Sequence, residues 1–123
     1  MVKTTNVGQV IELLSAMEEI RGQKMNKQAA KALFDLRKKA TETSNFFQEQ
    51  QKEIIDRLGL KIAPDGRIDF QNNEFLFKSY QNEIEELRHV EVNLDFEEVD
   101  LSEEDIKVSE AFIGATDGII KLF

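Results

Sequence analysis

The longest regular pattern of apolar positions runs through residues 27–58, where apolar or small side chains recur in alternating steps of four and three. Its members are Ala29, Leu33, Leu36, Ala40, Thr43, Phe47 and Ile54, with Gln50 in one place of the series. Sevenfold spacing of this kind keeps one side of a helix against a partner helix. Asn26 stands before the pattern as a side-chain cap, and Gly59 follows it as a left-handed stop. The pattern therefore predicts one long helix.

This helix is too long for the body of a small domain. At about 1.5 Å per residue it extends for ~48 Å, whereas a compact domain of this length has a radius of gyration of ~14 Å. We expect it to project, continuous or kinked, as half of an antiparallel helical hairpin over residues 7–58. The other half is an amphipathic helix over residues 7–21, capped by Thr5 or Asn6. The alternative is a break among the weak helix formers of residues 41–45.

Two shorter elements follow the long helix. Residues 60–70 predict a β-hairpin, because Pro64 and Gly66 suit a tight turn. Residues 73–88 predict a third helix that begins at an Asn72–Asn73 cap and carries apolar side chains on one face.

The C-terminal third begins with a strand pattern. Residues 90–101 alternate between apolar and polar positions, which predicts a strand buried on one side. Residues 102–123 open with Ser-Glu-Glu-Asp, typical of a capping box, and predict a capped helix or turn followed by an apolar tail that packs on the core. Together the elements predict one α+β domain over residues 1–123, with an antiparallel helical hairpin, a third helix and a small antiparallel β-sheet.

Charge is distributed unevenly along the chain. The net charge is −8, and residues 83–123 hold 13 acids and three bases, whereas residues 1–82 hold 11 acids and 13 bases. Nucleic-acid binding requires clustered bases, and we interpret the basic group at residues 37–39 as a solvated helix face, so we expect no nucleic-acid partner. The apolar runs are too short to span a bilayer, and residues 1–8 lack the apolar stretch of a secretion signal. We therefore expect no membrane partner and a cytosolic location.

Residue types that carry catalysis are scarce. The sequence has no Cys, which excludes a thiolate nucleophile and a thiolate metal site. His89 is the single His, and we expect a structural or solvated role for it. Gly114 and Gly118 do not form a phosphate-binding loop, and the acidic run at residues 89–105 lacks the spacing of a calcium loop. We expect no enzymatic activity, no catalytic residue, no cofactor and no metal ligand.

Surplus apolar and acidic residues are the candidates for protein contact. Three apolar side chains of the long helix lie off its main seam, namely Phe34, Phe46 and Ile55. Either the domain itself or another chain covers them. The acidic run adds five candidate carboxylates, namely Glu91, Asp95, Glu97, Glu98 and Asp100. These carboxylates are either the solvated side of a strand followed by a helix cap, or a surface that attracts a basic protein partner.

The order of the elements resembles a family of small proteins of uncharacterised function, encoded by phages and prophages, largely of Gram-positive bacteria. The resemblance rests on three segments, namely AAKALFDLRKKATETSNFFQEQQKEIIDRLGL, APDGRIDF and FLFKSYQNEIEELRHVEVNLDFEEVDLSEEDI. It covers roughly residues 27–112 and departs from the family at Glu98, where Pro is common, and in the Gly-rich final stretch. It implies a non-enzymatic accessory or structural phage protein, and it carries over no binding residue.

Two functional hypotheses follow. The first is protein–protein contact in virion or tail assembly, in an accessory structural role, or in a homo-oligomer. The alternative is inhibition of a host defence protein or DNA-binding protein through an acidic C-terminal surface that imitates DNA. The partner is then a phage structural protein or a host factor, and the location is the cytoplasm of the host cell or the virion.

Overall fold

The computed structural model describes residues 2–123, and Met1, which the predicted domain includes, lies outside the described residues. Within residues 2–123 the chain forms helices α1 (Val7–Glu19), α2 (Lys27–Leu58), α3 (Glu74–Arg88) and α4 (Glu110–Thr116). The strands are β1 (Val2–Asn6), β2 (Lys61–Ile62), β3 (Ile68–Asp69), β4 (Glu91–Asp95), β5 (Val99–Asp100) and β6 (Ile120–Lys121). The predicted α+β class is confirmed.

Helix α2 is continuous over its 32 residues. The side-chain oxygen of Asn26 accepts a hydrogen bond from the backbone N–H of Ala29 at 2.7 Å, and Gly59 ends the helix with a φ of +69°, where a side chain would be strained. The hydroxyl of Thr41 donates to the carbonyl of Arg37 at 2.8 Å, so the hydroxyl is satisfied within the helix. The predicted long helix is confirmed, and no break occurs at residues 41–45.

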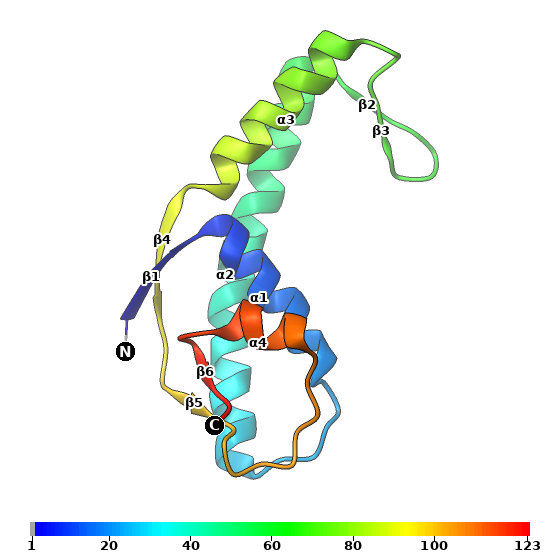
Figure 1. Ribbon diagram of the computed structural model, residues 1–123. Coiled ribbons are helices and arrows are strands. Elements are labelled where there is room, and N and C mark those ends of the chain that lie inside the picture. The colour runs from blue at the N-terminus through cyan, green and yellow to red at the C-terminus, as the bar shows by residue number, and fades with distance from the viewer. Residues whose placement is uncertain (1) are drawn as a thin grey trace.

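Two helices share the length of α2. Helix α1 has 13 residues and packs along the first half of α2, which gives the predicted helical hairpin, whereas α3 packs along the second half (Figure 1). The outer half of α2, α3 and the β2–β3 hairpin project together, and we call this projection the arm (Figure 1). Although α2 is long, no helix within residues 2–123 has both the length and the apolar character needed to cross a membrane.

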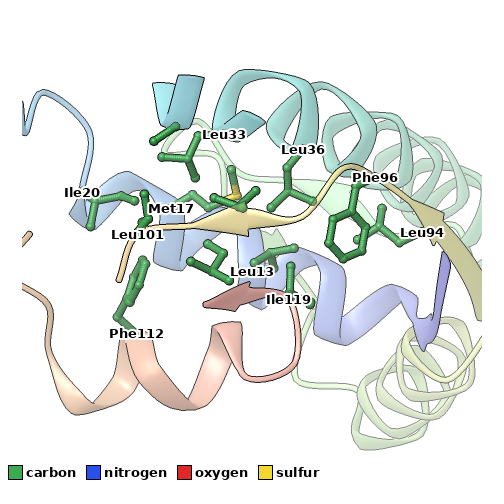
Figure 2. Close-up of a cluster of buried hydrophobic side chains, with 13 residues drawn as sticks. Leu13, Met17, Ile20, Leu33, Leu36, Leu94, Phe96, Leu101, Phe112 and Ile119 are labelled. Carbon is green, nitrogen blue, oxygen red and sulfur yellow. The ribbon is translucent and has the colours of Figure 1, made fainter. Parts of the chain in front are cut away.

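The hydrophobic core lies at the opposite end of the molecule from the β2–β3 hairpin. Side chains from α1, the first half of α2, β4, β5, α4 and the segment after α4 meet there (Figure 2). The cluster includes Leu13, Met17, Ile20, Leu33, Leu36, Leu94, Phe96, Val99, Leu101, Phe112, Ile119 and Ile120. The predicted seam of α2 is buried here at Ala29, Leu33, Leu36 and Ala40, and buried again at Ile54 in the arm. The core therefore fixes one end of α2.

Residues 90–101 form two strands, where one was predicted. Strand β4 pairs with β1 in antiparallel fashion, and β1 was not predicted. Strand β5 pairs in parallel with β6. The chain leaves β1 and pairs with β6 after Glu97–Glu98. The alternation of buried residues shifts by one position there, because Leu94 and Phe96 are buried before this point and Val99 and Leu101 after it.

The predicted capping box at Ser102 is wrong. The backbone N–H and the hydroxyl of Ser102 both donate to Asp100, at 2.9 and 2.5 Å, and this turn uses the hydroxyl that a cap would need. Helix α4 begins later, where Ser109 accepts from the backbone N–H of Phe112 at 3.2 Å. The apolar tail packs on the core through Ile119 and Ile120, as predicted, but Phe123 is exposed.

Candidate functional site

The three apolar residues predicted for partner contact do not form one patch. Phe34 and Phe46 are exposed, and Ile55 is half-buried. Phe34 lies at the core end of α2, where it lines a shallow hollow with Arg21 and Arg37. Phe46 lies 12 residues further along the same helix, about 18 Å away at ~1.5 Å per residue. The structure therefore separates these candidates along α2.

The five predicted carboxylates are all exposed, and the structure brings three of them together. Glu97, Glu98 and Asp100 line a hollow of about 320 Å³ beside the first turns of α2. The same hollow is lined by Glu103 and Glu104, which the alternation of the strand did not single out. We call the five carboxylates that line this hollow the acidic segment, namely Glu97, Glu98, Asp100, Glu103 and Glu104. Glu91 and Asp95 lie on β4, where Glu91 is opposite Asn6 and Asp95 is opposite Val2.

Hydrogen bonds hold two members of the acidic segment, Glu104 and Asp100, and favour the charged state of Asp100. Glu104 accepts from the backbone N–H of Asn26 at 3.3 Å and also from the side-chain amide of Asn26. The hydroxyl and then the backbone N–H of Ser102 lower the pKa of Asp100 below its ordinary value, and Lys121, 3.9 Å away, adds to this effect. Asp100 is therefore ionised at neutral pH.

Basic residues line the outward face of α2 next to this segment. Lys27, Lys31, Phe34 and Lys38 follow one another at helical spacing, all four are exposed, and we call them the basic stripe. Residues 21–39 hold seven bases and one acid, although the chain as a whole carries −8. The carboxylate of Asp35 lies 2.8 Å from the ammonium of Lys31, and the hydrogen bond and the charge of Asp35 raise the pKa of Lys31. Lys31 is therefore cationic at neutral pH.

The tip of the arm carries three exposed apolar side chains that sequence reasoning missed. Phe75 is 75% exposed, Ile62 53% and Phe77 42%. Phe70 holds the β2–β3 hairpin against α3. Its ring centroid lies 5.1 Å from that of Phe77, which it meets edge-on, and 5.6 Å from that of Tyr80. We call Ile62, Phe75 and Phe77 the tip residues. Their signal in the sequence is the run Phe75-Leu76-Phe77, which has more apolar residues than one side of a helix can bury.

The remaining candidates for chemistry do not converge. His89 ends α3, and its Nδ1–H donates to the carbonyl of Glu85 at 2.7 Å. Gly118 has a φ of +74° and lies beside the ammonium of Lys3, which donates to the carbonyl of Asp117 at 3.0 Å. Across residues 2–123, no group of three or more His, Asp or Glu side chains is arranged to hold a metal ion.

Comparison with known protein families finds no match, and neither a curated protein nor a solved structure matches the chain. The resemblance to small phage and prophage proteins therefore stays a prediction.

Proposed function

We propose that this chain is a non-enzymatic protein that acts by contact with another protein, and that the tip of the arm is the contact surface. The observation that carries this proposal is the exposure of three large apolar side chains, Ile62, Phe75 and Phe77, at the end of a projecting pair of helices. Complete burial of one such side chain contributes about 1.5–3 kcal/mol. Aromatic anchors commonly supply a large part of the binding energy of protein interfaces.

The arm supports this role mechanically. Helix α2 fixes the tip to the core, because the same helix is buried at Leu36 in the core and at Ile54 in the arm. The β2–β3 hairpin has only two residues in each strand, and a two-stranded hairpin of this size is marginally stable in water. A partner that covers Ile62 stabilises this hairpin and gains contact area at the same time.

The resemblance suggests the biological setting. We propose an accessory or structural phage protein that works in virion or tail assembly, with a phage structural protein as the partner at the tip. The chain then works in the cytoplasm of the host cell or in the virion. The spread of exposed aromatic residues over two ends of the molecule supports a role as a connector between proteins.

A photo-crosslinking amino acid at position 75 tests this function in infected cells. The protein that it captures is identified, purified and titrated against the wild type, Phe75→Ser and Phe123→Ser. We expect Phe75→Ser to weaken binding by at least ~10-fold, which corresponds to the loss of about 1.4 kcal/mol. Phe123→Ser is the control, because Phe123 is 88% exposed but lies at the core end. Equal binding by all three proteins contradicts the proposal.

The acidic segment supports a second candidate, the inhibition of a host DNA-binding protein by imitation of DNA. Five carboxylates around one hollow favour it, and the neighbouring Lys31 and Lys121 oppose it by partly offsetting their charge. Salt separates the two candidates, because screening weakens contacts between exposed charges and leaves apolar contacts in place. If the captured partner dissociates steeply between low and high salt and Phe75→Ser binds normally, the acidic candidate replaces the first.

A further inference from the structure

The basic stripe and the acidic segment occupy the same stretch of α2 on adjacent sides. Gln28 and Ala32 of α2 line the acidic hollow, and each follows a lysine of the stripe by about 100° around the helix. Glu97 also lies beside Lys38, since both line a second hollow next to β4. Two surfaces of opposite charge thus run side by side over the first three turns of the helix.

These charges are only partly paired within the chain. Lys31 pairs with Asp35, and Asp100 pairs with Lys121. Neither Lys27 nor Lys38 takes part in the ion pairs formed within residues 2–123. Phe34 stands between these two lysines and is 62% exposed, whereas Gln28, Ala29 and Ala32 line the acidic hollow on its α2 side, next to Asn26. A protruding ring with a basic surround therefore matches a hollow with an acidic surround.

We infer that two copies of this chain pair about a twofold axis parallel to α2, with the basic stripe of each copy on the acidic segment of the other. A rotation of 180° about such an axis keeps residues at the same height and exchanges the two adjacent sides of the helix. Both contacts then form at once, and the assembly closes as a symmetric dimer. Phe34 of each copy enters the acidic hollow of its partner, and Lys27 and Lys38 approach Glu97 and Glu98.

The charge pattern favours a second copy of this chain over a different partner at this face. Two basic stripes in direct contact would repel each other, so the stripe requires an acidic surface. The same chain offers one beside the same turns of α2, and the symmetric arrangement uses it twice. Complementary charges of this kind steer association and fix the register of an interface. The inference is independent of the tip, because a monomeric chain leaves the proposed contact at Phe75 in place.

Sedimentation of the full chain at low salt provides the first test. We expect a species of twice the 14.2 kDa chain mass, and we expect added salt to shift it toward the monomer. A single 14.2 kDa species at all concentrations overturns the inference. A dimer that is insensitive to salt also overturns it, because that interface would not depend on these charges.

Paired charge reversals provide the decisive test. Lys27→Glu/Lys38→Glu and Glu97→Lys/Glu98→Lys change only exposed side chains, and we expect each variant by itself to associate at least ~30-fold more weakly than the wild type. An equimolar mixture of the two should dimerise again, because every reversed stripe then meets a reversed acidic segment. Failure of the mixture to dimerise overturns the inference.

A matched control removes the effect of net charge. Lys52→Glu/Lys61→Glu carries the same net charge as the reversed stripe, but Lys52 and Lys61 lie in the arm. We expect this control to dimerise like the wild type, and equal weakening overturns the inference. Circular dichroism checks that each variant is folded. If a charge-reversed variant does not fold, Phe34→Ser tests the same contact without reversing a charge. A dimer with undiminished affinity in Phe34→Ser overturns the proposed position of the ring.

Discussion

Ser109 binds Glu19 through both of its donors: its backbone N–H and its hydroxyl donate to the two carboxylate oxygens at 2.8 and 2.6 Å. The same hydroxyl accepts from the backbone N–H of Phe112 at 3.2 Å. One side chain therefore caps α4 and fastens it to the last turn of α1, 90 residues earlier in the chain. These bonds hold the pKa of Glu19 below its ordinary value, the hydroxyl being the larger cause.

The first prediction concerns the pH dependence of stability. A carboxyl whose pKa is lower in the folded state stabilises that state above its unfolded pKa, about 4.3 for Glu, and this contribution is lost as the pH falls below that value. We expect Ser109→Ala to raise the pKa of Glu19 toward its ordinary value. The stability of this variant should therefore decrease less than that of the wild type as the pH falls. An NMR titration of the Glu19 carboxyl and thermal melts between neutral and acid pH measure both effects. Ser79→Ala in α3 is the control and should leave this pKa unchanged.

The second prediction compares two glycines. Gly59 has a φ of +69°, whereas Gly114 lies inside α4 without positive φ, and a Cβ there meets open space. Gly59→Ala should destabilise the protein by about 1 kcal/mol, because alanine is strained in the left-handed region. Gly114→Ala should stabilise it by up to about 1 kcal/mol, because alanine favours the helix. Urea denaturation measures both, and shifts of equal sign would contradict the assigned backbone conformations.

The third prediction concerns the core. Leu36 is completely buried between α1, α2 and β4. Leu36→Ala should destabilise the protein by about 2–5 kcal/mol through lost contacts and a cavity. Phe123→Ala should change stability by less than about 0.5 kcal/mol, because this side chain is exposed. Chemical denaturation of both variants checks the difference, and similar values would show that the seam of α2 is not the core.

The fourth prediction separates the hairpin from the rest of the fold. Phe70 is the residue whose ring holds β2 and β3 against α3. Phe70→Ala should open this hairpin locally, so the amide of Ala63, which donates to the carbonyl of Arg67 at 2.8 Å, loses protection from hydrogen exchange. The amides of α1 should keep their protection. Loss of protection in both places would mean that the hairpin and the core unfold together.

The elements that sequence reasoning predicted well carry their own start and stop signals. Helix α2 lies between Asn26 and Gly59, and α3 is capped by Asn73, whose side chain accepts from the backbone N–H of Leu76 at 3.2 Å. Strand β1 has no such signal. It is a short, largely polar segment that forms its backbone hydrogen bonds with β4, and this pairing exists only once the chain has folded.

The surfaces were harder to predict than the elements. The sequence shows that Phe75, Leu76 and Phe77 cannot all face the same way, but the angle at which α3 packs on α2 decides which of them stays exposed. The acidic segment likewise depends on the turn at Asp100–Ser102, which brings Glu103 and Glu104 to the same hollow as Glu97. Both outcomes are set by tertiary packing and not by local pattern.

Because α2 runs without interruption from the core into the arm, the reach of this protein is adjustable in steps. Seven residues inserted into α2 and seven into α3 extend both helices by about 10.5 Å and return each to nearly the same rotational phase. Related chains whose arms differ in length by whole heptads would then hold the same tip residues at different distances from an unchanged core.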